Sequence, residues 1–290
     1  MPVKPPRPPS PPLTALRSFE AAARLNGFTR AADELCVTPG AIAQQVKQLE
    51  QWAGAPLFER QAQGVVLTEA GGMVLPAMTQ AFDQIGEAVR QLRQATSPNR
   101  IQLAALPSVA QLWLSPRLPA LRTAMPDLVL SVTAMETPPN LGREPFDLSL
   151  FFMEEGGAAI AQDVLFPVCS PDLAAKVDSI DDLNVLPCLH DATWAEDWGL
   201  WLSSFGADHI TPRGPVHSLY ALAVDDALNG AGILMGHGPL VARHLQSGAL
   251  VAPFTYRLSR PAHLGIETRA GILPAPLKEL VDLLSGKSRL

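Results

Sequence analysis

The segment Thr29–Ala53 reads TRAADELCVTPGAIAQQVKQLEQWA and decides the fold of the N-terminal part of the chain. Two short helical patterns are separated by a break that ends at Thr38. Thr38 is a suitable N-cap for the second helix, because its hydroxyl can accept a hydrogen bond from a free N–H of the first turn. Pro39 then occupies the first helical position, where its missing N–H costs nothing. The segment therefore predicts a helix, a tight turn and a second helix.

The second predicted helix has an apolar and a polar face. The apolar face is formed by Ile42, Val46, Leu49 and Ala53, and the polar face by Gly40, Gln44, Lys47 and Gln51. The first helix offers only a small apolar face of Ala31, Ala32 and Leu35. This pair matches the helix-turn-helix pattern, whose second helix lies in the DNA major groove. An ordinary helical hairpin has the same spacing, so the pair alone leaves both interpretations open.

The sequence around this pair carries a resemblance to a known family. The run LTALRSFEAAA starts at Leu13, PLFER starts at Pro56 and VLTEAG starts at Val66. In this order they resemble the N-terminal domain of LysR-type transcriptional regulators. Later motifs are similar to the branch that contains the glycine-cleavage activator and the β-lactamase-inducing regulator. These motifs are WLSPRL at Trp113–Leu118, PVCSP at Pro167–Pro171, LHD at Leu189–Asp191 and GPVHS at Gly214–Ser218, so the resemblance covers essentially the whole chain.

The resemblance implies the domain organisation and the fold class. We expect an α/β protein with an N-terminal winged helix-turn-helix dominated by helices and a two-lobed effector domain like a periplasmic binding protein. The expected parts are a proline-rich arm (1–12), the DNA-binding domain (13–68), a dimerisation linker helix (69–96), a hinge (97–100) and the effector-binding domain (101–290). Lobe I is expected to comprise residues 101–167 and 258–290, and lobe II residues 168–257.

Independently of the resemblance, the sequence pattern after residue 100 predicts an α/β domain. Short apolar runs alternate with helical patterns, which indicates a parallel, doubly wound sheet. Strands are expected at 101–106, 129–134, 148–152, 165–169, 185–189, 233–235 and 262–267. Helices are expected at 109–123, 195–205, 219–228, 240–245 and 275–284.

Length, composition and cysteine usage limit the function classes. The 290 residues are enough for about two domains with sizeable cores. No apolar run approaches the roughly 18 residues that span a bilayer, and the proline-rich start does not resemble a signal peptide. We therefore expect a cytoplasmic protein without membrane contact. Cys36, Cys169 and Cys188 have no metal-ligand spacing, so we expect buried structural thiols, with a Cys169–Cys188 redox pair as the alternative.

The charge distribution is unusual for a DNA-binding protein. Nine basic and eight acidic residues precede Ser97, a net charge of +1, and the remaining chain carries −7 of the total −6. Because phosphate neutralisation supplies much of the affinity for DNA, we expect weak binding per protomer. Dimer or tetramer avidity would then compensate. A wing is expected at 60–67, but its tip Gln61-Ala62-Gln63 lacks the further arginine that relatives usually carry.

Residues in the helix-turn-helix and the wing are candidates for DNA contact. The set is Thr29, Arg30, Thr38, Pro39, Gly40, Gln44, Lys47 and Arg60. Gln44 is suited to adenine edges in the major groove, and Lys47 to guanine or a phosphate. Relatives often carry serine at the position of Ala43, which would add a phosphate contact.

A long helical pattern follows Thr68, a suitable N-cap with Glu69 near the positive end of the helix dipole. Apolar residues recur at spacings of three and four: Leu75, Met78, Phe82, Ile85, Val89 and Leu92. Such a seam is typical of a coiled-coil surface, although a helix packed on its own domain is the alternative. In the family this helix pairs two protomers, and the resemblance implies dimers and often tetramers. Pro76 removes one backbone hydrogen bond near the first turns.

Candidate effector contacts lie where strands end and helices begin, the usual ligand position in α/β folds. Ser108 and Ser218 occupy such junctions, match effector-contacting positions of the family, and could alternatively be plain N-caps. Weaker candidates near strand ends or lobe junctions are Thr137, Phe151, Trp194 and Tyr220. No basic cluster accompanies the serines, so we favour a small, partly apolar carboxylate as the effector.

Catalytic chemistry has no support in the sequence. Gly230-Ala231-Gly232 follows a helix and precedes a strand, the reverse of a nucleotide-binding loop, so a helix cap explains it better. No G-x-S-x-G motif is present, and His190-Asp191 is expected to shape a turn. We expect no enzyme, no cofactor and no metal. The function expected is a promoter-binding regulator with a small-molecule effector and RNA polymerase as a further partner. Two alternatives are a sensor that has lost DNA binding and a hydrolase or transferase on the α/β part.

Overall fold

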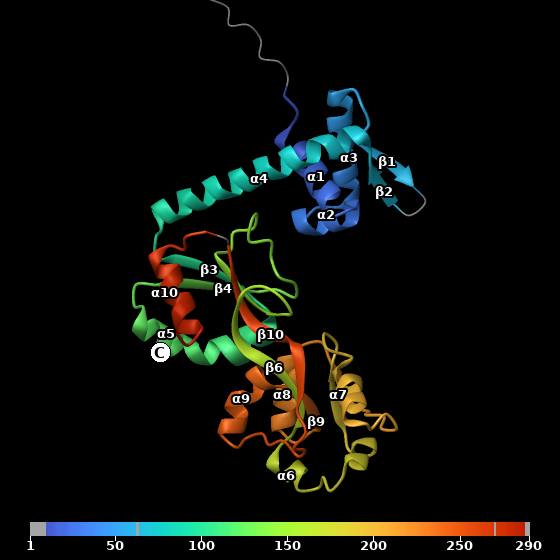
Figure 1. Ribbon diagram of the computed structural model, residues 1–290, viewed down its shortest axis with the longest axis vertical. Coiled ribbons are helices and arrows are strands. Elements are labelled where there is room, and N and C mark those ends of the chain that lie inside the picture. The colour runs from blue at the N-terminus through green and yellow to red at the C-terminus, as the bar shows by residue number, and fades with distance from the viewer. Residues whose placement is uncertain (1–9, 62–63, 270, 288–290) are drawn as a thin grey trace, which may run out of the picture. The chain divides into compact units, whose positions relative to one another are not determined.

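The computed structural model describes residues 10–61, 64–269 and 271–287, and the chain forms two compact units, residues 1–92 and 93–290. The first unit begins with α1 (Leu13–Arg24), α2 (Phe28–Leu35) and α3 (Pro39–Ala53) (Figure 1). These are the helices expected from the sequence. Of the expected proline-rich arm, residues 1–9 lie outside the described part of the chain.

Local chemistry fixes the turn between α2 and α3. The Thr38 hydroxyl accepts from the N–H of Ala41 at 3.2 Å, and Pro39 follows at the first helical position, as predicted. Gly54 ends α3 in the left-handed region with φ of 72°. The buried face of α3 consists of Ile42, Val46 and Leu49. Ala53, expected on that face, is exposed because it lies in the last turn, beyond the reach of α1 and α2.

The expected wing is a two-stranded ribbon of β1 (Phe58–Gln61) and β2 (Gly64–Leu67), paired antiparallel. Ala62 and Gln63 of its expected tip lie outside the described residues. A carboxylate oxygen of Glu50 in α3 accepts from the backbone N–H groups of Leu57 (2.8 Å) and Phe58 (3.1 Å). This side chain therefore ties the start of the ribbon to the second helix of the helix-turn-helix.

The long helix α4 (Glu69–Thr96) follows the ribbon. Its start is capped as predicted, because the Thr68 hydroxyl accepts from the Gly71 N–H at 3.1 Å. A Cβ atom at Gly71 would lie 2.4 Å from the carbonyl oxygen of Leu57, so this close approach requires glycine. None of the described helices is both long and apolar enough to cross a membrane.

The second unit contains an eight-stranded sheet in the order β4-β3-β5-β10-β6-β9-β7-β8 among the described residues. Its strands are β3 (Arg100–Ala105), β4 (Val129–Ala134), β5 (Leu148–Met153), β6 (Ala158–Val168), β7 (Cys188–Asp191), β8 (Val216–His217), β9 (Ile233–His237) and β10 (Leu258–Thr268). One end is a parallel group of β4, β3 and β5, and the other a parallel group of β9, β7 and β8. Between them, β6 and β10 run antiparallel to each other and to their neighbours.

This topology confirms the two-lobed α/β fold and corrects one detail. The prediction of a parallel sheet holds within each lobe, but the crossing strands β6 and β10 are antiparallel and longer than expected. Each passes from one lobe to the other, so its sequence pattern changes along its length. The strand expected from Val185 begins at Cys188, because the turn Ile180–Asn184 and Pro187 precede it.

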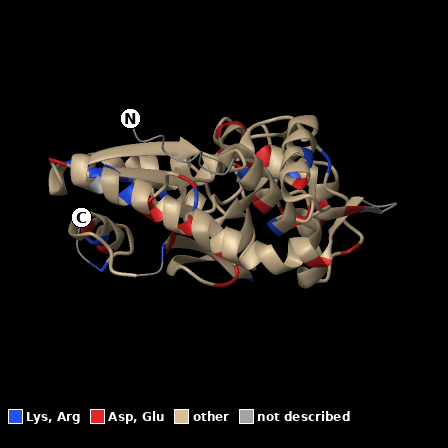
Figure 2. Cartoon of the chain, turned by 90° about the horizontal axis from the view of Figure 1, so that it is seen from above, with Lys and Arg blue, Asp and Glu red and all other residues tan. Residues whose placement is uncertain are grey.

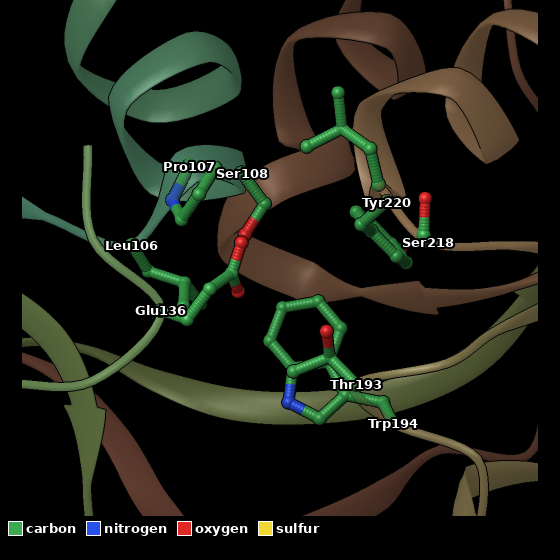
Figure 3. A pocket seen from close by; sticks show the side chains of 9 residues that line it. Leu106, Pro107, Ser108, Glu136, Thr193, Trp194, Ser218 and Tyr220 are labelled. Atoms are coloured by element: carbon green, nitrogen blue, oxygen red, sulfur yellow. The ribbon is translucent and has the colours of Figure 1, made fainter. Parts of the chain in front are cut away.

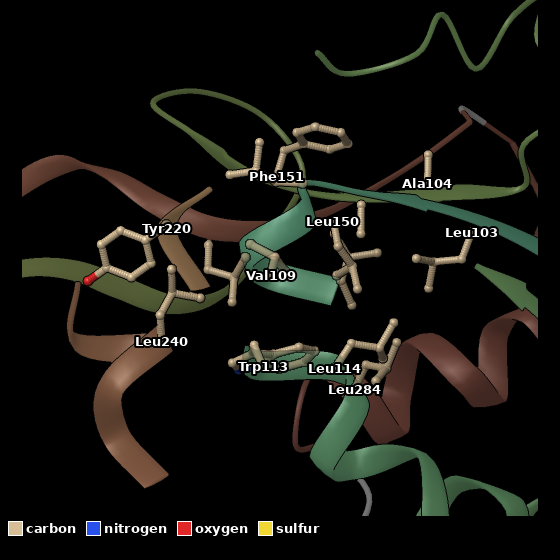
Figure 4. Close-up of a cluster of buried hydrophobic side chains, with 14 of the residues drawn as sticks. Leu103, Ala104, Val109, Trp113, Leu114, Leu150, Phe151, Tyr220, Leu240 and Leu284 are labelled. Carbon is tan, nitrogen blue, oxygen red and sulfur yellow. The ribbon is translucent and has the colours of Figure 1, made fainter. Parts of the chain in front are cut away.

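Helices cover the sheet in both lobes: α5 (Leu118–Ala124), α6 (Pro171–Ala174), α7 (Asp197–Phe205), α8 (Tyr220–Leu228), α9 (Gly238–Gln246) and α10 (Ala275–Leu284). The helix expected over 109–123 is instead a π-helical turn (Val109–Leu114), a 3₁₀ turn (Ser115–Arg117) and α5. Pro116 and Pro119 lack an N–H, which accounts for the interruption. Leu103, Val109, Trp113 and Leu150 belong to the main core (Figure 4).

Candidate DNA-binding surface and effector pocket

The polar face of α3 is exposed and carries the predicted base-reading residues. Gln44 and Lys47 are both exposed, one turn apart, on the side opposite buried Ile42 and Val46. Thr38, Pro39 and Gly40 lie at the exposed N-terminus of the same helix. A helix with this division can lay its polar side in a major groove while its apolar side holds it to α1 and α2.

One basic residue of this unit, Arg24, is paired within the protein. The Arg24 guanidinium contacts both carboxylate oxygens of Glu34 at 2.5 and 2.7 Å and Glu20 at 3.1 Å. Burial tends to lower the pKa of Arg24, but the pairing with Glu34 and Glu20 raises it overall. Figure 2 shows basic and acidic residues interspersed along the chain. Arg24 is thus part of the internal structure rather than a candidate for phosphate contact.

Two other predicted contacts lie near the start of α2 and in the wing. Thr29 and Arg30 are exposed in the first turn of α2, and the Arg30 guanidinium donates to the carbonyl of Asn26 at 3.1 Å. Arg60 lies in β1, and its side chain is outside the described residues.

The apolar seam of α4 serves two purposes. Leu75 and Met78 are partly buried and pack against the core of the helix-turn-helix. The Thr79 hydroxyl next to them donates to Glu20 of α1 at 3.1 Å. Ile85, Val89 and Leu92 are 46, 45 and 65% exposed, and Phe82 is half-buried between the two sets. The dimerisation assignment is therefore corrected for Leu75 and Met78, because the same spacing suits packing on the helix's own domain.

A pocket lies between the two lobes where parallel strands end. Leu106, Pro107 and Ser108 follow β3, and Glu136 follows β4 in lobe I (Figure 3). In lobe II, Thr193 and Trp194 follow β7, and Ser218 to Tyr220 follow β8. The hollow measures about 220 Å³, including its open mouth. The carboxyl ends of strands from both lobes thus converge on one site, as the ligand rule for α/β folds expects.

The hydroxyls of the two pocket serines do not cap a helix, although Ser108 occupies the N-cap position of the turn at Val109–Leu114. The Ser108 hydroxyl is buried, makes no side-chain capping bond to the helical turn at Val109–Leu114, and has no hydrogen-bond partner among the described residues. Helix α8 begins after Leu219, so Ser218 lies outside the capping position, and its side chain is exposed at the pocket. The plain N-cap alternative is therefore wrong for both residues, and the Ser108 hydroxyl is a buried polar group without a partner.

The weaker predictions divide into two pairs. Trp194 and Tyr220 line the pocket, and their rings meet edge to face with centroids 5.0 Å apart. Thr137 is not among the lining residues; the neighbouring Glu136 is. Phe151 is 3% exposed and lies in the core, which corrects its assignment (Figure 4). A residue of β5 that faces the core looks the same in sequence as one that faces a ligand.

Sequence reasoning missed Glu136 and Thr193 as lining residues. Asp191 at the end of β7 holds the lobe II side of the pocket, because its Oδ1 accepts from the N–H groups of Thr193 (2.9 Å) and Trp194 (3.1 Å). Asp191 therefore shapes a turn as predicted, whereas His190 is simply a strand residue. The position of Thr193 after a strand end was the signal that could have identified it.

The cysteines agree only in part with the prediction. Cys169 and Cys188 are buried free thiols, and burial raises their pKa values to about 11 and about 12. Such thiols carry little thiolate at neutral pH and react slowly. Cys36 is exposed, contrary to the prediction, and lies at the end of α2 in the left-handed region with φ of 53°.

Comparisons with known proteins agree with this geometry. Residues 13–72 match the family of bacterial regulatory helix-turn-helix proteins of the lysR type, and residues 94–288 match the LysR substrate binding domain. The chain belongs to the LysR family of transcriptional regulators. It is 33% identical over 251 residues to the glycine cleavage system transcriptional activator of Escherichia coli, which covers 83% of this chain and 82% of the relative. It is 32% identical over 256 residues to the transcriptional activator AmpR of Pseudomonas aeruginosa, covering 85% and 86% of the two chains.

A solved structure extends the comparison to the fold. The effector domain of AmpR from Pseudomonas aeruginosa superposes with a TM-score of 0.54 at 22% identity, covering 65% of this chain and 95% of that domain. The protein is therefore a LysR-type regulator with a helix-turn-helix DNA-binding domain and an effector-binding domain. The alternative of a sensor that has lost its DNA-binding function has no support from these relatives.

Proposed function

We propose that this regulator reads its operator through the exposed face of α3, with Gln44 at a base edge and Lys47 at a base or phosphate. Thr38, Pro39 and Gly40 would lie against the backbone at the helix N-terminus, and Thr29, Arg30 and Arg60 would touch flanking DNA. Support comes from the exposure of Gln44 and Lys47 on the side away from the buried face. Acting on promoter DNA, the protein would work in the cytoplasm and contact RNA polymerase.

We further propose that the pocket between the lobes binds a small effector with a carboxylate group. The observation that carries this proposal is the buried Ser108 hydroxyl, which lies at the pocket and lacks a partner within the part of the chain that the structure describes. Leaving such a group unsatisfied costs about 1–3 kcal/mol, which a ligand acceptor would recover. The exposed carboxylate of Glu136 at the rim could pair with a cationic group on the same effector.

Calorimetric titration tests this assignment. Acetate, propionate, glycine and alanine would each be titrated into the full-length protein, and into Ser108→Ala, Ser218→Ala and Ser247→Ala. Ser247 is an exposed serine whose hydroxyl donates to the His244 carbonyl, so it is a matched control. We expect at least one ligand to release heat with the wild type and with Ser247→Ala, and much less with the two pocket variants. Equal heats from all four proteins would contradict the site.

The exposed part of the α4 seam supports self-association. Ile85 and Val89 are nearly half exposed, and a second copy of the helix would cover them. In this proposal Phe82 and Leu92 extend the same surface. Dimers would place two α3 helices on two half-sites, and dimers of dimers would add further avidity. Sedimentation of Val89→Glu should show a shift toward monomer, and an unchanged dimer would contradict this role.

A further inference from the structure

Three buried ionisable side chains and one partly exposed arginine form a cluster immediately behind the pocket. His237 ends β9 and is 0% exposed. Its Nδ1 lies 3.0 and 3.1 Å from the two carboxylate oxygens of Asp163. Its Nε2 lies 2.9 Å from Oδ2 of Asp197, a close ion contact that is not aligned as a hydrogen bond. Arg260 closes the ring, with Nη1 3.2 Å from Asp197 and 3.6 Å from Asp163.

With both carboxylates ionised, the cluster is neutral when the His237 imidazole is protonated. Two carboxylates then face one imidazolium and one guanidinium, and each negative charge has a positive partner. Burial on its own would lower the pKa of His237, but the contacts with Asp163 and Asp197 raise it overall. Deprotonation would leave one buried carboxylate charge uncompensated, which is costly in an apolar interior.

The remaining groups that face His237 do not compete for its proton. The Tyr220 hydroxyl accepts from the His237 backbone N–H at 3.1 Å and donates to the Met235 carbonyl at 2.9 Å, and burial raises its pKa. Burial also raises the pKa of Asp191, while the nearby His237 tends to lower it. The faces around His237 thus come from β6 (Asp163), α7 (Asp197), β10 (Arg260), β7 (Asp191) and α8 (Tyr220).

The imidazole ring lies against the rear of the pocket wall. The ring centroids of Trp194 and His237 are 3.9 Å apart with an interplanar angle of 41°, and Tyr220 meets His237 edge on at 5.4 Å. Both aromatic residues line the pocket (Figure 3). A cation against an aromatic face is attracted by about 0.5–2 kcal/mol, more when water is excluded. This contact links the Trp194 ring to the group of ionisable side chains behind it.

The cluster also joins the crossing strands to lobe II. Asp163 lies in β6 and Arg260 in β10, where the pairing of these two strands shifts register between Ser259 and His263. Asp197 and His237 belong to α7 and β9 of lobe II. The connection between the lobes and the wall of the pocket therefore share one set of charges.

We propose that protonated His237, held by Asp163, Asp197 and Arg260, is a positioning residue that fixes Trp194 and Tyr220 as the inner wall of the effector pocket. Removal of the positive charge releases Trp194 and opens the wall to solvent. The link to effector binding rests on the function proposed for this pocket, whereas the position of Trp194 can be measured without any effector.

Fluorescence of Trp194 in the full-length protein tests the proposal. The contribution of Trp194 is obtained by subtracting the emission of Trp194→Phe in each background. A protonated imidazole in ring contact quenches indole emission, so we expect the Trp194 contribution to be weak at neutral pH and to rise several-fold as the pH is raised through the pKa of His237. In His237→Gln the contribution should be strong and independent of pH.

A matched control and a second readout complete the test. His209→Gln removes an exposed histidine paired with Asp181 at 3.1 Å and should behave as the wild type. Acrylamide, a neutral collisional quencher, should reach Trp194 about threefold faster in His237→Gln. Equal emission, pH profile and acrylamide access in His237→Gln and wild type would overturn the proposal. If His237→Gln does not fold, a flat pH profile in the wild type overturns it alone. Neither readout uses DNA or effector, so failure here is distinct from failure of the proposed effector site.

Discussion

The two functional surfaces use charge in opposite ways. At the DNA-binding surface, α3 presents Gln44 and Lys47 to solvent, while Arg24 of the same unit is held by Glu34 and Glu20 inside the protein. In the effector unit, the charges are buried behind the pocket, where His237 lies between Asp163 and Asp197. The comparison leads us to expect that DNA binding depends mainly on shape, base contacts and avidity, and that the effector pocket depends on a compensated set of charges behind it.

Removing one buried charge gives the largest expected effect. Asp163→Asn leaves the positive charges of the cluster short of a partner, and breaking a buried ion pair in this way costs about 3–5 kcal/mol. Denaturant unfolding monitored by circular dichroism measures the loss. Asp181→Asn is the control, because its exposed contact with His209 contributes no more than about 1 kcal/mol. Equal losses of unfolding free energy in Asp163→Asn and Asp181→Asn would contradict the claim that the buried charges stabilise the protein more than the exposed ones.

The pH dependence of the unfolding free energy tests whether His237 in the buried cluster is protonated. The pKa of His237 is raised in the folded protein, so its stabilising contribution is fully present below the unfolded value of about 6.5. That contribution is lost as the pH rises through the folded pKa, because the native state must then give up a proton that it holds more tightly. The unfolding free energy of wild type relative to His237→Gln should therefore fall with increasing alkalinity. A constant difference across this range would show that His237 is neutral.

Base reading by α3 is expected to have an intermediate effect. Replacing Gln44 with alanine should lose discrimination at one base pair, worth about 1–3 kcal/mol for a bidentate contact. Competition between single-base operator variants measures this preference. Gln51→Ala, on the same face about two turns beyond Gln44, is the control that should retain it. Unchanged discrimination between operator variants in Gln44→Ala would contradict this assignment and indicate that another residue contacts the base.

The smallest effect is expected from a phosphate contact. Lys47→Ala should weaken all sequences nearly equally and reduce the slope of log K against log salt by about 1. Retardation at several salt concentrations gives the slope for the variant and the wild type. A loss of sequence preference with an unchanged slope would instead assign Lys47 to a base.

Features that depend on neighbouring residues, such as the start of a helix, could be predicted from the sequence. Features that depend on packing between distant elements could not. Thr38 and Pro39 specify the start of α3 through their own chemistry, so this helix could be predicted locally. The family resemblance was needed to distinguish a helix-turn-helix from an ordinary helical hairpin. The apolar seam of α4 has the same spacing whether a residue packs on its own domain or pairs with a second copy of the helix. Only the tertiary packing shows that Leu75 and Met78 contact the core of their own domain.

The pocket residues could be predicted only in part. Ser108 and Ser218 were identifiable because strand ends have a sequence pattern, but a strand residue such as Phe151 gives no sign of which face it occupies. The cluster around His237 draws on β6, α7, β9 and β10, and no local pattern brings these elements together. Charge compensation across the sheet is visible only once the strand order is known.

One measurement tests the central claim that this regulator binds specific DNA with little help from phosphate charge. The purified protein would be mixed with the DNA upstream of its own gene and the adjacent divergent gene, and retardation and footprint followed at two salt concentrations. We expect a protected, partly palindromic site whose affinity falls only modestly with salt. A folded dimer that forms no specific complex even at low salt would contradict the account.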